Sequence, residues 1–352
     1  MSKKLMKGNE AIAMGAILGG CEAFFGYPIT PQNEVPELLS KYMHEHKKVF
    51  VQAESEISAI NMVYGASGAG ARVMTSSSSP GIALKQEGIT YLCGAMLPCV
   101  IVNVMRGGPG LGGIQPAQSD YFQITRGGGN GDYRVISYAP ENLQETVNIM
   151  KEVFDIADYY RNPVMVAVDG LIGQMMEPVD LDMEVKKRVL QEKTWATTSG
   201  HTDNDRRYIT SLFLDPEVLY QHNISLQKKY KEIENNEVRY ELINMENADY
   251  VIVAYGSIAR ICRSVILILK ERGINVGIIR PITLWPFPKK PISELKSIKK
   301  IIVCEMSMGQ MIDDVMIANT KQIPISFFGR SGGVVPEPNE IADFIEKEVK
   351  EV

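Results

Sequence analysis

Short apolar runs alternate with amphipathic stretches through the first half of the chain. Between the runs at 134–138 and 164–168, Leu143, Val147 and Phe154 recur at helical spacing. Asp, Ser, Gly and Pro mark the junctions between the runs and the amphipathic stretches. Because strands that are apolar along their whole length are buried on both faces, this pattern indicates a parallel sheet with helices on both sides. The predicted strands cover residues 24–28, 49–52, 72–75, 98–105, 134–138 and 164–168.

The pattern changes after residue 178, where charged and amide residues become dominant. This composition predicts a linker whose residues 215–244 form one or two polar helices that dock on a neighbouring surface. A second alternating block begins near residue 248 and ends with an amphipathic helix at 339–349. Its predicted strands cover residues 250–255, 275–279, 300–304 and 323–327.

Length and charge agree with this division. The chain has 352 residues, 45% of them hydrophobic, and at about 150 residues per domain this length predicts two domains. The net charge is −5 without a basic run, so we expect no general nucleic-acid binding, and no apolar run reaches the length of about 18 residues that a membrane span needs. We therefore predict an α/β protein with a first parallel-sheet domain at 1–190, a charged helical linker at 191–246 and a smaller parallel-sheet domain at 247–352.

The cysteines favour a reducing compartment. No two of the five have the CxxC spacing of a redox or metal motif, so a disulfide framework, a zinc ribbon and a self-contained iron–sulfur cluster are not expected. We expect buried free thiols and a cytoplasmic protein. The cysteines are Cys21, Cys93, Cys99, Cys262 and Cys304.

The N-terminus resembles an export signal only superficially. Lysines precede the short apolar run 11–20, and Cys21 follows it as in a lipoprotein cleavage box. Acidic Glu10 and Glu22 flank the run, so we favour a helix from about Asn9 that packs under the first strand.

A glycine-rich segment follows the predicted strand 98–105. Its GxGxxG spacing at Gly108, Gly110 and Gly113 matches a dinucleotide site, which requires a helix to begin there. Pro116 is unfavourable in such a helix, so we favour a flexible loop over a nicotinamide or flavin site.

Polar residues follow four predicted strands at their carboxyl ends, where open α/β sheets bind ligands. Thr30 lies between two prolines that direct its hydroxyl outward, although a rigid turn without a ligand explains this pattern equally well. Glu56 begins a predicted helix, either as a simple first-turn carboxylate or as one held in a dry cleft to share a proton with a ligand nitrogen. Ser79 is predicted to cap a helix, and Arg106 is either a carboxylate anchor or part of a surface salt bridge.

Taken together and in this order, the strand ends resemble those of the α-type subunit of 2-oxoacid:ferredoxin oxidoreductases. These thiamine-diphosphate enzymes decarboxylate a 2-oxoacid, pass electrons to ferredoxin and form an acyl-CoA. The resemblance covers almost the whole chain and implies a pyrimidine-binding domain followed by a transketolase C-terminal-like domain, both of the thiamine-diphosphate-enzyme type. The matching segments are 8–11, 26–31, 54–59, 75–81, 104–106, 139–141, 254–257, 280–288 and 305–309.

The resemblance implies roles for three residues. Thr30 would lie near the substrate and the thiazolium ring, Glu56 would contact N1′ of the aminopyrimidine, and Arg106 would bind the substrate carboxylate. Glu54 is the weaker candidate for N1′, because Glu56 has the matching spacing to Gly65. A carboxylate at N1′ favours the imino tautomer, whose 4′-nitrogen can remove the proton from C2.

The resemblance also implies partner chains. Enzymes of this class anchor the diphosphate and Mg²⁺ through a Gly-Asp-Gly motif, and Asp169 lacks the leading glycine. We therefore expect a thiamine diphosphate shared with a β subunit that binds this cofactor. Mg²⁺ and iron–sulfur clusters are expected on partner subunits and not on this chain. The other expected subunits are a γ subunit and a ferredoxin-like iron–sulfur subunit. Ferredoxin, a 2-oxoacid and coenzyme A would be the other partners.

Several interpretations stay open. Segments 108–121 and 126–133 resemble the branched-chain (2-oxoisovalerate) form, and the 2-oxoglutarate form is the alternative. Another thiamine-dependent enzyme would pass its product to lipoamide or transfer an aldehyde unit without redox chemistry. In a non-catalytic scaffold, Thr30, Glu56 and Arg106 would only be turn and cap residues.

Overall fold

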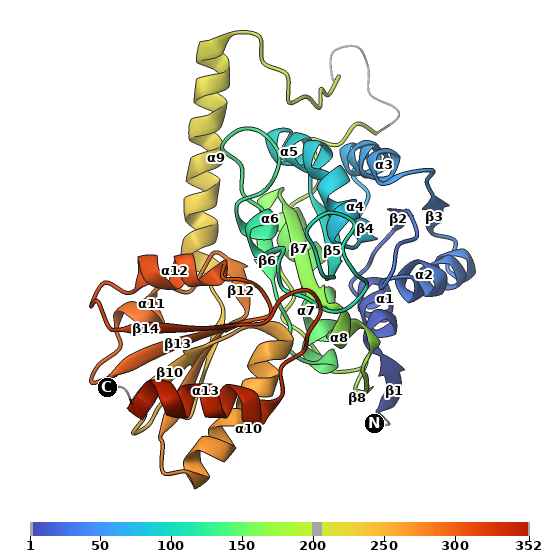
Figure 1. Ribbon diagram of the computed structural model, residues 1–352. Coiled ribbons are helices and arrows are strands. Elements are labelled where there is room, and N and C mark those ends of the chain that lie inside the picture. Colours follow the sequence, from blue (N-terminus) through green and yellow to red (C-terminus); the bar gives the residue numbers. More distant parts are fainter. Residues whose placement is uncertain (1–2, 199–205, 351–352) are drawn as a thin grey trace.

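A computed structural model describes residues 3–198 and 206–350, so residues 199–205 of the predicted linker lie outside the described residues. The chain forms a seven-stranded sheet and a five-stranded sheet, which lie side by side with helices on both faces of each (Figure 1). None of the helices in the described ranges is long and apolar enough to cross a membrane.

The larger sheet is parallel except for one edge strand. Its order is β12-β6-β7-β5-β4-β2-β3, and β12 pairs with β6 in the antiparallel direction. The structure confirms all six strands predicted in the first block, with ends that shift by at most two residues. The strands are β2 (Ala23–Gly26), β3 (Val49–Gln52), β4 (Val73–Ser77), β5 (Cys99–Met105), β6 (Ile136–Tyr138), β7 (Pro163–Asp169) and β12 (Thr283–Trp285).

Two helical layers bury the faces of this sheet. One layer contains α1 (Gly8–Leu18), α2 (Glu34–Glu45) and α7 (Leu143–Tyr160), which surround a core of residues such as Phe24, Val102 and Val166. The other layer contains α3 (Glu56–Gly68), α4 (Ser79–Leu84) and α5 (Gln86–Gly94), whose apolar core continues into the second sheet. The helix predicted near Asn9 and the burial of Cys21 are both confirmed.

The smaller sheet has the order β14-β13-β10-β11-β9, parallel except for β9. Helices α10 and α13 pack on one face, and α11 and α12 cover the other. The four predicted strands of the second block and its final helix are confirmed. The elements are β9 (Tyr240–Ile243), β10 (Tyr250–Val253), β11 (Val276–Pro281), β13 (Lys300–Glu305), β14 (Ile325–Gly329), α10 (Gly256–Glu271), α11 (Lys290–Ser293), α12 (Met311–Ala318) and α13 (Pro338–Lys350).

Short strands differ most from the sequence-based expectation. β9 lies within the predicted linker but pairs with the second sheet, whereas β12 lies within the predicted second domain but pairs with the first. β1 (Lys4–Lys7) and β8 (Met176–Val179) form a further antiparallel pair. Edge strands of three or four residues carry too little apolar periodicity to be recognised, so the two domains prove more interwoven than the sequence predicts.

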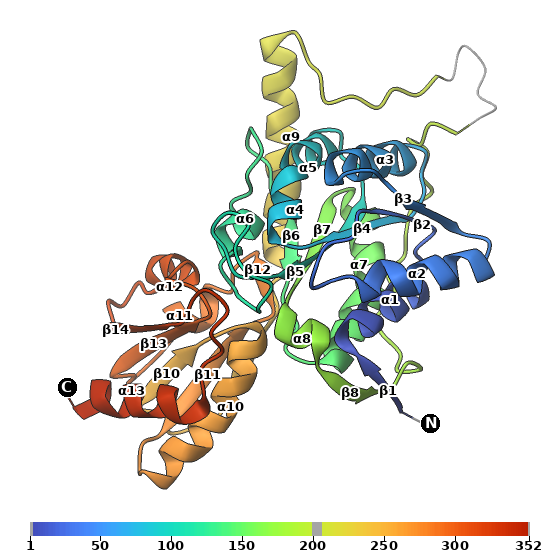
Figure 2. The same ribbon diagram turned by 45° about the vertical axis from the view of Figure 1, so that its right-hand side comes forward.

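Three further helices complete the fold. α6 (Tyr121–Thr125) and α8 (Gly170–Gln174) are single short turns beside the first sheet. α9 (Pro216–Asn236) is the polar helix predicted in the linker, and its C-terminal half docks through Leu226, Tyr230 and Ile233. Its N-terminal end extends beyond the sheet at the top of the view (Figure 2).

Candidate active site

The carboxyl ends of β2, β3, β4 and β5 meet at one edge of the larger sheet, because these strands are parallel neighbours. The loops that follow them carry Thr30, Glu56, Ser79 and Arg106 in turn. The tertiary structure thus gathers at one edge the residues that the sequence analysis selected from four separate segments.

Glu56 is the first residue of α3. The hydroxyl of Ser55 caps the helix by accepting a hydrogen bond from the Ser58 amide at 3.2 Å, so Glu56 is not needed as a cap. Its side chain is only 6% exposed and forms no hydrogen bond or ion pair with any residue in 3–198 or 206–350. By contrast, Glu54 is exposed and accepts a hydrogen bond from the hydroxyl of Ser58.

The space beside Glu56 is shaped by a glycine and two serines. A Cβ atom at Gly81 would lie 2.5 Å from Oε1 of Glu56 and 2.1 Å from Oγ of Ser77, so a larger residue there would displace these two side chains. The hydroxyls of Ser77 and Ser78 are buried and find no partner among the residues that the structure describes. Such groups usually have partners in folded proteins, so these hydroxyls and the Glu56 carboxylate form a cradle with unused hydrogen-bonding capacity.

A buried lysine lies behind this cradle. Nζ of Lys85 donates to Oγ1 of Thr75 at 2.8 Å, and the side chain is fully buried. Burial lowers the pKa of Lys85 to about 8, against the opposing influence of the Glu56 charge. The sequence analysis missed this residue, although a lone lysine directly after the apolar run Ile82–Leu84 was a usable signal.

Ser79 has a different role from the predicted one. The helix α4 begins at Ser79, so its N-cap is Ser78, and the prediction was wrong by one residue. The Ser79 hydroxyl donates instead to Asp120 at 2.5 Å and accepts from the backbone amide of Arg106 at 2.9 Å. Burial raises the pKa of Asp120, while hydrogen bonds from Ser79 and Asn103 act in the opposite direction.

Arg106 follows β5 and points into the protein, with an exposed fraction of 6%. Its Nη1 donates to the carbonyl of Thr30 at 2.8 Å and its Nη2 to the carbonyl of Leu111 at 3.0 Å. Nε is buried without a partner, and no acidic side chain of the described chain forms an ion pair with the guanidinium. The alternative of a surface salt bridge is therefore wrong, because this charge is buried and held only by neutral carbonyls.

Thr30 is exposed at the rim of a cleft of about 670 Å³. Ile114 and Pro116 of the glycine-rich loop, Leu171 of α8 and Val335 of the second domain line the same cleft. The described residues in its lining include no lysine or arginine. Residues 107–113 form no helix, so the prediction that this segment is a loop is confirmed.

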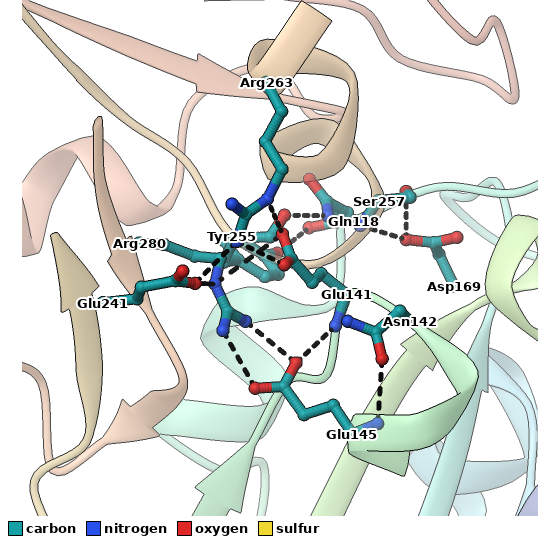
Figure 3. A network of polar contacts seen from close by, with 10 residues as sticks. All are labelled: Gln118, Glu141, Asn142, Glu145, Asp169, Glu241, Tyr255, Ser257, Arg263 and Arg280. Atoms are coloured by element: carbon teal, nitrogen blue, oxygen red, sulfur yellow. Dashed lines mark hydrogen bonds and ion pairs between the residues drawn. The ribbon is translucent and has the colours of Figure 1, made fainter. Parts of the chain in front are cut away.

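A seam of polar contacts joins the two domains beside this edge. Arg280 donates to both carboxylate oxygens of Glu145 at 2.9 Å and to Glu241 at 2.9 Å, and Arg263 bridges Glu141 and Glu241 (Figure 3). The carboxylate of Asp169, part of the incomplete Gly-Asp-Gly motif, caps α8 and accepts from the Ser257 hydroxyl.

Comparison with known proteins identifies the family. The chain matches the model "Pyruvate flavodoxin/ferredoxin oxidoreductase, thiamine diP-bdg" over residues 14–241 and that of pyruvate:ferredoxin oxidoreductase core domain II over residues 248–341. The chain belongs to the 2-oxoacid:ferredoxin oxidoreductase family. It is therefore a subunit of a ferredoxin-dependent oxidoreductase and contains a thiamine-diphosphate-binding domain, as the sequence motifs implied.

Two relatives within this family cover nearly the whole chain. The ketoisovalerate oxidoreductase subunit VorB of Methanothermobacter thermautotrophicus is 47% identical over 98% of this chain and 97% of its own length. The 2-oxoglutarate synthase subunit KorA of Methanocaldococcus jannaschii is 34% identical over 97% of this chain and 98% of its own.

Solved structures share the architecture. A 2-oxoglutarate:ferredoxin oxidoreductase from Magnetococcus marinus, with 2-oxoglutarate, coenzyme A and succinyl-CoA bound, has a TM-score of 0.88 and 28% identity. The match covers 99% of this chain and 65% of that chain. A split-gene transketolase has a TM-score of 0.62 at 14% identity, which indicates a shared fold only. The predicted thiamine-diphosphate-enzyme fold is confirmed.

Proposed function

We propose that this chain is the pyrimidine-binding subunit of an enzyme that oxidatively decarboxylates 2-oxoisovalerate (ketoisovalerate) and other branched-chain 2-oxoacids. The products would be an acyl-CoA, CO₂ and reduced ferredoxin. The higher identity to the ketoisovalerate subunit than to the 2-oxoglutarate subunit supports this choice. The proposal depends above all on one observation: Glu56 is only 6% exposed, and its carboxylate has no partner within the described chain.

Glu56 has the properties needed to hold the aminopyrimidine ring. When bound, thiamine diphosphate supplies the carbon nucleophile and the electron sink that decarboxylation of a 2-oxoacid requires. Glu56, which is only 6% exposed, would share a proton with N1′ of that ring. The unpaired hydroxyls of Ser77 and Ser78 would offer further hydrogen bonds to the polar edge of the same ring.

Arg106 and Thr30 would bind the substrate at its carboxylate end. The guanidinium now donates to two neutral carbonyls, and a carboxylate would replace them with stronger, charge-assisted hydrogen bonds. Because the carboxylate leaves as CO₂, Arg106 would orient the bond that breaks.

The cleft beside Thr30 favours an aliphatic side chain. Ile114, Leu171 and Val335 present apolar surface, whereas the second carboxylate of 2-oxoglutarate would find no lysine or arginine in the described lining. It would instead face Glu34. Burial opposes ionisation of Glu34, but hydrogen bonds from Asn9 and other groups outweigh it, so the pKa of Glu34 lies below its usual value.

Partner chains would complete the enzyme. Asp169 is already engaged by α8 and Ser257, which supports placing the diphosphate and Mg²⁺ on a β subunit. The iron–sulfur clusters would belong to partner chains, including a γ subunit and a ferredoxin-like subunit. The five cysteines of this chain are buried and free, which supports a reducing, cytoplasmic location.

The test is a substrate panel on the complex co-purified from its native host, with coenzyme A and a viologen acceptor. We expect kcat/KM for 2-oxoisovalerate to exceed that for 2-oxoglutarate by at least about 100-fold, because the cleft lacks a partner for a second carboxylate. Preference for 2-oxoglutarate would overturn the substrate assignment. Reduction of lipoamide in place of viologen would indicate another thiamine-dependent enzyme, and no turnover of any 2-oxoacid would favour a scaffold.

A further inference from the structure

The loop that follows Arg106 sets the position of its guanidinium. Leu111 in this loop provides one of the two carbonyls that hold the guanidinium. The loop is closed on itself, because the Gly107 amide donates to the Gln115 carbonyl and the Gly113 amide to the Gly107 carbonyl, both at 2.9 Å. A shift of residues 107–116 would therefore move the Leu111 carbonyl away from Arg106.

The second domain holds the end of this loop through Gln118, which is fully buried. Its backbone amide donates to the Met306 carbonyl at 2.8 Å, and its side-chain oxygen accepts from the Met306 backbone amide at 3.1 Å. Its Nε2 donates to the Tyr255 carbonyl at 2.9 Å, and its own carbonyl accepts from the Tyr255 hydroxyl at 3.1 Å (Figure 3). All four hydrogen bonds are made with two residues of the second domain, Tyr255 and Met306.

A glycine turn of the second domain contacts the loop near both of its ends. A Cβ atom at Gly107 would lie 3.2 Å from the carbonyl carbon of Gly332, so the two backbones are in close contact. A Cβ atom at Gly333 would lie only 2.3 Å from Cβ of Gln115. Gly333 also has a φ of +95°, a conformation that favours glycine.

We propose that Gly333 and Gln118 are positioning residues, through which the second domain fixes loop 107–116 and thereby the orientation of Arg106. This inference rests on the proposed role of Arg106 in binding the substrate carboxylate. It gives the second domain a part in substrate binding, because even a small misplacement of an anchoring group has a large effect on reactivity. The role is indirect, since both residues act on Arg106 through loop 107–116.

Gly333→Ala in the assembled complex tests this proposal. Because the new Cβ collides with Gln115, we expect KM for the 2-oxoacid to rise by about 10-fold with a smaller change in kcat. Hydrogen exchange of residues 107–116 should become faster. Gly273→Ala is the matched control, since Gly273 has a similar φ of +75° but a Cβ added there would meet no atom within 4 Å, and it should change neither KM nor that exchange.

A compensating variant separates positioning from a general loss of structure. Gly333→Ala combined with Gln115→Gly removes the colliding atom, so KM should return to within about 2-fold of the original value. Faster exchange in 107–116 without a change in KM, or no rescue by Gln115→Gly, would overturn the proposal.

Arg106→Ala distinguishes this proposal from the proposed function. Loss of the guanidinium should raise KM by about 50-fold, because charge-assisted hydrogen bonds to the carboxylate disappear. If Arg106→Ala leaves KM unchanged, the proposed role of Arg106 fails. If Arg106→Ala raises KM and Gly333→Ala does not, only the positioning role fails.

Discussion

The sheet edge and the interdomain seam use buried polar groups in opposite ways. At the edge, the hydroxyls of Ser77 and Ser78 and Nε of Arg106 have no partner within the described chain. At the seam, Arg280 is 4% exposed and each of its three nitrogens donates to a carboxylate. Both regions remove polar groups from water, but only the seam replaces the lost hydrogen bonds internally.

This difference separates binding from stability. A buried polar group without a partner destabilises the fold, and under the proposed function a ligand would supply the missing bonds at the edge. A buried ion pair with complete hydrogen bonding holds elements in one arrangement instead. The seam is therefore satisfied internally, whereas the edge keeps hydrogen-bonding capacity that the proposed ligands would use.

The largest effect should come from Glu56→Gln at the edge. The amide keeps the size of the side chain but cannot share a proton as a carboxylate does, so 2-oxoacid turnover by the assembled complex should fall about 1,000-fold. Viologen reduction measures this rate, and thermal melting of the variant should match the original protein.

Glu54→Gln is the control for this variant, since Glu54 is exposed and bonded to Ser58. It should leave the rate within about 2-fold of the original. If the Glu56→Gln variant turns over the 2-oxoacid at the original rate, the unpaired groups at the edge do not serve the reaction. The proposed contrast between a binding edge and a structural seam would then fail.

The next effect concerns the seam. Arg280→Met leaves Glu145 and Glu241 without their buried partner, so the free energy of unfolding should fall by about 3 kcal/mol. Urea unfolding of the full chain measures it. Arg272→Met removes contacts to Asp343 and Glu346 nearer the surface, where solvent screens ion pairs, and should lower the free energy of unfolding much less. Equal losses in the two variants would contradict a structural role for the seam.

The smallest effect is a pH dependence at the edge. Burial lowers the pKa of Lys85 from 10.5 to about 8, so between these values the unfolded chain binds more protons at this position than the folded chain. Stability contributed by Lys85 must then rise with pH, by about 2 kcal/mol between pH 8 and pH 10. The Lys85→Met variant lacks this titrating group. The difference in the free energy of unfolding between the original protein and the variant should therefore change with pH by this amount.

Taking the difference in the free energy of unfolding between the two proteins removes the titrations of groups that do not interact with Lys85. Burial raises the pKa of Cys21 and Cys93 to about 12, which acts in the opposite direction above pH 9 but is common to both proteins. Urea unfolding at pH 8, 9 and 10 gives the comparison. A difference that does not change with pH would mean that Lys85 is not held in a buried, unfavourable position.

Local pattern was sufficient for most of the fold and for selecting three candidate site residues, whose roles were implied only by the family resemblance and stay predictions. Buried parallel strands are long apolar runs, and Thr30, Glu56 and Arg106 directly follow such runs. The cap at Ser79 was misplaced by one residue, because adjacent serines offer equivalent caps. Lys85 and Asp120 were missed, because their importance arises from burial beside residues distant in sequence.

The sequence by itself determined the alternation of strands and helices, the family and the order of the segments that follow the carboxyl ends of the strands, since each depends on neighbouring residues. Only the tertiary structure decided that β12 crosses into the first sheet, that Gln118 is held by Tyr255 and Met306, and that Arg106 lacks an ion pair within the described chain. These features join residues more than 100 positions apart or depend on what surrounds a side chain. No local periodicity records such contacts, because burial and pairing are properties of the folded chain.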